Sequence, residues 1–82
     1  MWEAALSPMD EHNMLHKANE ISKFFASYPH DEAVAGIQNH LRMYWVPRMR
    51  RQIIDYVADG GTELHPLAVE AVKLLDAPVI RS

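Results

Sequence analysis

The histidines are the residues whose type and spacing best suit chemistry in this 82-residue chain, which contains no cysteine. His12 and His16 stand four residues apart, a spacing that places both imidazoles on one face of a helix. Two histidines can begin a zinc site, but the glutamate of the usual zinc motif is missing and no third ligand is placed. Both also fall opposite the apolar side of the expected helix. We therefore interpret them as solvent-exposed histidines.

His40 lies at the edge of the apolar face of the next expected helix. A catalytic base needs a partner nucleophile and an orienting group, and the sequence offers no convincing pair. We interpret His40 as a half-buried residue that hydrogen-bonds a carbonyl or contacts a partner, and His65, just before Pro66, as part of a helix start. Phosphate-binding glycine loops and a nucleophile elbow are missing from the sequence. An enzyme acting through His40 is the hypothesis that the sequence supports least.

Arginines form the other chemical cluster, because Arg42, Arg48, Arg50 and Arg51 are half of the eight lysines and arginines. Arg48 and Arg51 fall on the polar face of the third expected helix, and Arg51 can pair with Asp55 four residues on. Arg50 falls inside or beside the apolar stripe, where a guanidinium needs a carboxylate or several carbonyls. For Arg50, pairing with an acidic residue of this chain and contact with a partner both stay open.

Trp45 and Gly36 complete the candidate partner surface. Trp45, next to Tyr44 and the arginines, has the composition of an interface hot spot and stands before a helix break, where it can protrude. We expect Tyr44 to fill the core instead. A mid-helix glycine costs about 0.5–1 kcal/mol relative to alanine, so Gly36 indicates a surface that another backbone approaches closely. The residues expected at a partner interface are Gly36, His40, Met43, Trp45, Pro47, Arg48, Met49 and Arg50.

Apolar residues recur at helical spacing, and this pattern predicts an all-α fold of about four helices. We expect one helical domain over residues 1–82, in which residues 1–6 and 77–82 are tails. Ser7 caps the first helix, and His30 or Asp31 caps the second. Prolines and the pair Gly60-Gly61 mark the remaining boundaries. The expected helices cover residues 8–28, 31–46, 47–59 and 66–75.

The last of these helices is apolar around most of its circumference, and only Glu70 and Lys73 mark a polar strip. A chain of this length builds only a modest core. We therefore expect apolar surface that needs cover from a partner.

Composition narrows the class of protein. The net charge of −3 argues against nonspecific nucleic-acid binding, which depends on neutralising phosphates. No apolar run approaches the length of a membrane span, and residues 1–6 lack the basic and apolar regions of a signal peptide. A chain without cysteine suits a reducing compartment. We expect a cytoplasmic protein that binds neither membrane nor nucleic acid.

Four blocks of sequence carry a family resemblance. They are Lys17-Ala18-Asn19-Glu20-Ile21 with Phe24-Phe25; Glu32-Ala33-Val34-Ala35-Gly36-Ile37 with His40-Leu41; Trp45-Val46-Pro47-Arg48-Met49-Arg50; and Gly60-Gly61 with Leu64, Pro66-Leu67 and Ala71-Val72. In this order the blocks resemble the small delta subunit of NAD-dependent formate dehydrogenases that contain molybdenum or tungsten.

The resemblance implies an accessory subunit of a cytoplasmic complex that oxidises formate to CO2 and reduces NAD⁺. It assigns catalysis, the molybdopterin-type cofactor, the iron–sulfur clusters and FMN to partner subunits, and carries no catalytic, cofactor or metal residue over to this chain. We expect docking on the large catalytic subunit, in support of its stability or cofactor loading. Two alternatives stay open: a free-standing assembly factor for that subunit, and a small helical nucleic-acid-binding module that uses Arg42, Arg48 and Arg51.

Overall fold

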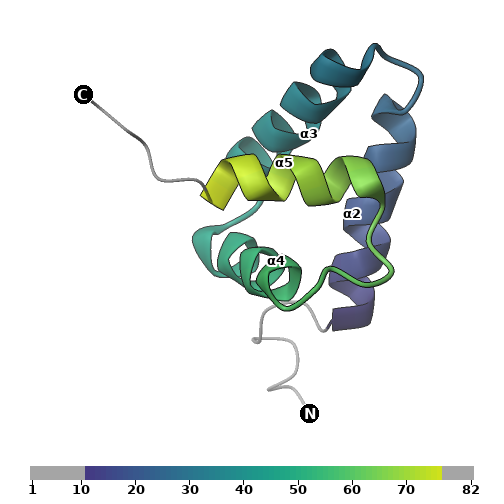
Figure 1. Ribbon diagram of the computed structural model, residues 1–82. Helices are drawn as coiled ribbons and strands as arrows, with labels where there is room; N and C mark the ends of the chain where they lie inside the picture. The colour runs from purple at the N-terminus through teal and green to yellow at the C-terminus, as the bar shows by residue number, and fades with distance from the viewer. Residues whose placement is uncertain (1–10, 77–82) are drawn as a thin grey trace.

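The computed structural model describes residues 11–76, which form four α-helices (Figure 1). These are α2 (Glu11–Phe25), α3 (His30–Tyr44), α4 (Pro47–Ala58) and α5 (Pro66–Asp76). The described residues contain no strand, so the all-α prediction is confirmed. The expected helix start at Ser7 and Pro8 lies outside the described residues, as do both expected tails.

Proline and glycine set the boundaries of α4 and α5. Pro47 and Pro66 each occupy the first helical position, where a missing N–H costs nothing. After α4, the amide of Gly60 donates to the carbonyl of Val57 at 3.0 Å, and the amide of Gly61 donates to the carbonyl of Tyr56 at 3.1 Å. Both glycines have positive φ, 125° and 64°. This hydrogen-bond pattern is a Schellman motif, as the glycine pair predicts.

The turn between α2 and α3 differs from the prediction. α2 ends at Phe25, three residues before Tyr28, and two turns follow. The N-cap of α3 is Pro29, whose carbonyl accepts the amide of Ala33 at 2.8 Å, and no side chain caps this helix. The expectation that His30 or Asp31 caps α3 is wrong, because both are already helical. Asp31 lies in the first turn, where a carboxylate favours the positive end of the helix dipole.

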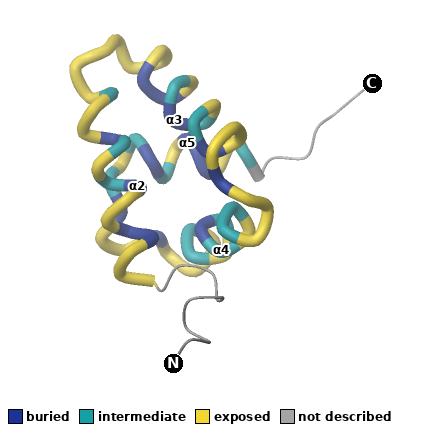
Figure 2. Tube along the Cα trace, turned by 180° about the vertical axis from the view of Figure 1, so that it is seen from behind, coloured by how far each residue is buried: buried dark blue, intermediate teal, exposed yellow. Residues whose placement is uncertain are grey.

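Helix α5 lies at the centre of the fold and packs against α2, α3 and α4. Three residues of this helix, Ala68, Ala71 and Val72, are almost completely buried. The side chain of Leu74, by contrast, is mostly exposed. Figure 2 shows the buried residues of the helices facing one another. The expectation that α5 needs a partner to cover it is therefore wrong for Ala68, Ala71 and Val72, because the neighbouring helices already bury them.

The buried core draws on all four helices and on the turns that precede and follow α4. Its members are Met14, Leu15, Ala18, Val34, Ile37, Leu41, Trp45, Ile53, Leu64, Ala68, Ala71 and Val72. Trp45 is only 6% exposed, whereas Tyr44 is 69% exposed, the reverse of the prediction. The reason is the backbone at Trp45, which is extended (φ −98°, ψ 134°) and therefore leaves the phase of α3. Helical angles place a side chain only while the helix continues.

Gly36 lies against the ring of Phe25 from α2. A Cβ atom built on Gly36 would stand 2.4 Å from Cε1 of Phe25, well inside van der Waals contact. The close approach expected at this glycine is present, but the group that approaches is a side chain of the same molecule. The interpretation of Gly36 as part of a partner surface is therefore corrected: its missing side chain makes room for packing between α2 and α3.

We expect Gly36→Ala to lower the free energy of unfolding by about 1 kcal/mol, although alanine is the better helix former. The ring of Phe25 must move outward, and the loss of its burial outweighs the gain in helix propensity. Urea unfolding followed by circular dichroism measures the change.

The control is the same substitution in a Phe25→Ala background, where the obstacle is gone. There Gly36→Ala should raise stability by about 0.5–1 kcal/mol, the ordinary propensity difference. The same sign in both backgrounds would show that the ring does not determine the choice of glycine.

Candidate interface at the turn between α3 and α4

Only Trp45 and Val46 separate α3 from α4, so the two helices meet at a tight corner. The amide of Trp45 still donates to the carbonyl of Leu41, at 3.2 Å. The carbonyl of Val46 accepts the amides of Met49 and Arg50 at 2.9 and 3.0 Å and so begins α4. The indole of Trp45 enters the core behind the corner. Backbone and side chain therefore both hold this turn.

Arg50 joins the two helices across the corner. Its Nη1 donates to the carbonyls of Leu41 at 3.4 Å and of Arg42 at 3.1 Å, and also to the carbonyl of Trp45. These carbonyls belong to the C-terminal end of α3, where a positive charge is favourable. The sequence left open whether a carboxylate of this chain or a partner accepts the hydrogen bonds of Arg50. In the structure, neither is needed for the hydrogen bonds of Nη1. Backbone carbonyls of its own chain accept the hydrogen bonds of Nη1.

Three large apolar side chains stand exposed around the buried Trp45. Met43 is 65% exposed, Tyr44 69% and Val46 55%. Arg42 and Arg48 flank them in the sequence, and both are exposed. We call these five residues the corner surface. Large apolar side chains gathered in this way are typical of an interaction site.

His40 lies beside the corner surface, and its ring packs against that of Tyr44 with centroids 4.8 Å apart. The side chain is half-buried, as predicted. Burial lowers the pKa of His40, so the neutral imidazole is favoured at neutral pH. His40 therefore contributes a flat, uncharged ring that supports Tyr44.

The structure brings some of the expected interface residues together and separates others. His40, Met43, Pro47 and Arg48 gather at the corner, and Met49 and Arg50 lie half-buried behind it. Trp45 belongs to the core, so its interpretation as a protruding anchor is wrong. Tyr44, which was expected to fill the core, takes the exposed place. Because the backbone leaves the helical path after Tyr44, the ring of Trp45 is buried and the ring of Tyr44 is exposed, the opposite of the expectation.

A second exposed group, the aromatic patch, consists of Phe24, Phe25 and Tyr28 at the turn between α2 and α3. The ring centroids of Phe24 and Phe25 lie 5.1 Å apart, and those of Phe25 and Tyr28 lie 5.3 Å apart. Phe24 and Tyr28 are exposed. The helix expected over residues 8–28 includes Tyr28, whereas α2 ends at Phe25.

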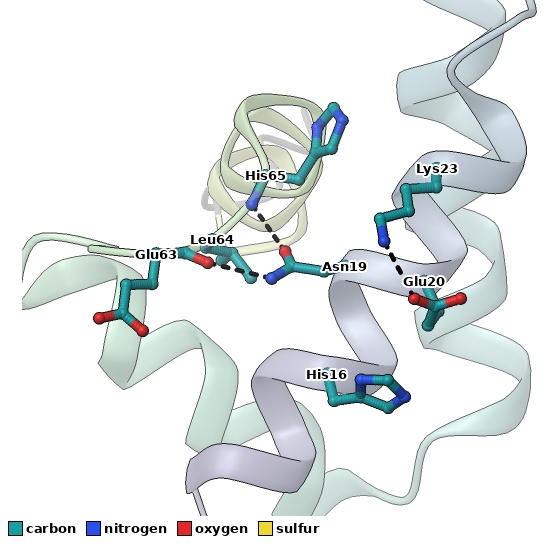
Figure 3. Close-up of a pocket in the computed structure, with 7 residues that line it drawn as sticks. All are labelled: His16, Asn19, Glu20, Lys23, Glu63, Leu64 and His65. Carbon is teal, nitrogen blue, oxygen red and sulfur yellow. Dashed lines mark hydrogen bonds and ion pairs between the residues drawn. The ribbon is translucent and has the colours of Figure 1, made fainter.

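Asn19 on α2 holds the loop that leads into α5 (Figure 3). Its Nδ2 donates to the carbonyl of Glu63 at 3.0 Å, and its Oδ1 accepts the amide of His65 at 2.7 Å. The Nδ1 of His65 in turn accepts the amide of Leu67 at 3.1 Å. His65 thus caps α5, as expected of a residue at a helix start. Sequence reasoning missed Asn19, because nothing in a helical pattern shows which loop a polar side chain contacts.

A hollow of about 340 Å³ lies between α2 and this loop. It is lined by His16, Asn19, Glu20, Lys23, Glu63, Leu64 and His65 (Figure 3). Lys23 pairs with Glu20 at 3.2 Å on its rim. Within residues 11–76, no group of three His, Asp or Glu side chains is arranged to hold a metal ion. His12 and His16 are exposed, in agreement with their interpretation.

Ion pairs elsewhere are exposed. Arg51 pairs with Asp55 at 3.5 Å, as predicted. His30 contacts Glu70 at 2.9 Å and ties the start of α3 to α5. None of the helices in the described part combines the length and the hydrophobicity that crossing a bilayer requires.

Fold and surface together describe a small helical protein whose most exposed apolar group faces outward from a rigid corner. The chain matches the family of the NADH-dependent formate dehydrogenase delta subunit, FdsD, over residues 13–72. It belongs to that family, and the resemblance inferred from the four sequence blocks is confirmed. No curated protein and no solved structure matches the chain.

We expect Arg50→Ala to lower the free energy of unfolding by about 1–3 kcal/mol, because the carbonyls of Arg42 and Trp45 lose the donor that Arg50 supplies. Arg48→Ala is the matched control at an exposed position and should change stability by less than about 0.5 kcal/mol. Thermal and urea unfolding of both variants measure the difference. Equal effects would show that the contacts of Arg50 do not stabilise the corner.

We expect Asn19→Ala to increase hydrogen exchange selectively in the loop before α5, because the amide of His65 loses its acceptor. The loss of two hydrogen bonds should lower stability by about 1–3 kcal/mol. Amide exchange measured by NMR locates the effect. Asn39→Ala, at an exposed site on α3, is the control, and equal exchange at His65 in both variants would contradict the role of Asn19.

Proposed function

We propose that this chain is a non-catalytic accessory subunit that docks on the large catalytic subunit of formate dehydrogenase through the corner surface. Membership of the delta-subunit family supports the assignment to the complex. In this proposal the partner subunits hold the molybdopterin-type cofactor, the iron–sulfur clusters and FMN. They oxidise formate and reduce NAD⁺ in the cytoplasm, and the delta subunit supports the stability or cofactor loading of the catalytic subunit.

The single observation that carries the docking proposal is the exposure of Met43, Tyr44 and Val46 within four residues. A small domain exposes apolar side chains singly as a matter of course, but three large exposed ones within four residues of one turn support an interaction site there. Arg50 and Trp45 hold the backbone beneath these side chains. The surface is therefore ordered before a partner arrives, which reduces the entropy cost of binding.

We expect the triple variant Met43→Ser/Tyr44→Ser/Val46→Ser to be lost from the complex when tagged formate dehydrogenase is purified from the native host. The side chains removed are exposed, so the variant should keep its helical circular dichroism. The variant Phe24→Ser/Tyr28→Ser removes exposed rings from the aromatic patch and is the matched control. It should copurify like the unchanged protein.

Three outcomes would contradict the proposal. Normal copurification of the triple variant would exclude the corner surface as the docking site. Failure of the unchanged chain to copurify would exclude a permanent subunit. Full activity and stability of formate dehydrogenase without this chain would exclude a supporting role. Capture only with a catalytic subunit that lacks its cofactor would identify an assembly factor instead.

A further inference from the structure

The corner surface lies in the one long stretch of the sequence without acidic side chains. Between Glu32 and Asp55 there are four arginines and no aspartate or glutamate, although the whole chain has a net charge of −3. The helices α3 and α4, which contain most of this stretch, meet at the corner (Figure 1). The segment on both sides of the corner is therefore positively charged in a chain whose net charge is negative.

Two of the four arginines already have partners in the fold. Arg50 donates to the carbonyls at the end of α3, and Arg51 pairs with Asp55. Arg42 and Arg48 are different, because both are exposed and neither forms an ion pair with another of the side chains described, those of residues 11–75. They stand on either side of Met43, Tyr44 and Val46 in the sequence. The two arginines without an ion pair among the described side chains are therefore next in the sequence to Met43 and one residue removed from Val46.

Arg48 also lies in an electrostatically unfavourable place within its own helix. It is the second residue of α4, where the helix dipole is positive, and the first turn of α4 contains no acidic residue. By contrast, α2 and α3 have Glu11, Asp31 and Glu32 in their first turns. A carboxylate from a partner would neutralise the positive charge of Arg48 and would also interact favourably with the positive end of the α4 dipole.

We propose that the partner segment covering the corner surface presents carboxylate side chains to Arg42 and Arg48 around an apolar side chain that packs on Met43, Tyr44 and Val46. This inference rests on the proposed function and names the chemistry of the partner at the same site. Complementary charge at the rim of an apolar contact sets the orientation and the rate of association. Two exposed arginines that form no ion pair among the described side chains, on a chain of net charge −3, suit a protein carboxylate better than a polyanion, which needs many cationic contacts.

The test uses the full chain and the purified formate dehydrogenase complex from which this subunit has been removed, with affinity measured at low and at high salt. Arg42→Glu/Arg48→Glu should weaken binding at least about tenfold at low salt, because like charges then face each other. The neutral variant Arg42→Gln/Arg48→Gln should weaken binding less and remove its salt dependence. Circular dichroism confirms that each variant is folded.

Lys17→Glu/Lys23→Glu is the matched control, because it makes the same change in net charge on α2, away from the corner (Figure 1). It should bind like the unchanged chain. Arg48→Lys supplies a second readout, since a carbodiimide condenses the introduced ammonium group with an adjacent carboxylate to an amide. Mass spectrometry of the cross-linked peptide should then identify an aspartate or glutamate of the partner.

The outcomes separate this inference from the proposed function. If the unchanged chain binds the complex but the charge-reversed variant binds equally well, with no effect of salt, the carboxylate partner is excluded and the docking function stands. If the unchanged chain does not bind the complex at all, the proposed docking function is excluded, and the inference that rests on it is excluded with it. Steeply salt-dependent binding of single-stranded RNA that Arg42→Glu/Arg48→Glu abolishes would assign the surface to a nucleic acid and overturn the inference.

Discussion

The contact between the guanidinium of Arg50 and the carbonyls at the end of α3 is the interaction on which the exposed part of the molecule depends. A helix that stops abruptly leaves carbonyls without donors, and water is their usual partner. Here a side chain from the first turn of the next helix takes that role, so the end of one helix is tied to the beginning of another. Trp45 fills the core beneath. The angle between α3 and α4 is thereby fixed, and the residues outside the corner are held in place.

The sequence blocks that resemble the delta-subunit family contain the residues that connect one helix or loop to the next. Asn19 holds the loop before α5, Gly36 makes room for Phe25, and Arg50 ties α3 to α4. Gly60 and Gly61 end α4. Each of these residues acts at a point where two elements meet, and none belongs to a catalytic arrangement in the described residues. The family pattern in this chain thus includes residues that determine how the helices are arranged.

Most of the helical architecture was predictable, because local chemistry determines it. Proline at Pro47 and Pro66, and glycine after Ala58, mark boundaries whatever the rest of the chain does. The candidate site was predictable only in part. The expected partner interface near Pro47, with its arginines, stays a prediction, whereas the exposure of Tyr44 and the burial of Trp45 are the reverse of what was expected. Their exposure depends on the direction of the backbone beyond the last helical turn, and periodicity says nothing about residues outside a helix.

The amino-acid sequence by itself determined the starts of α4 and α5, the distribution of charge along the chain, the family and the absence of cysteine chemistry, because each of these is a property of residues near one another in the chain or of composition. Only the tertiary structure showed which side chains contact one another across the helices. It placed α5 between three helices, turned Arg50 toward carbonyls, set Phe25 against Gly36 and left Met43, Tyr44 and Val46 exposed. The physical reason is that a side chain's burial is shared with neighbours distant in sequence, and only their arrangement in space shows which apolar surface the fold covers and which it leaves for a partner.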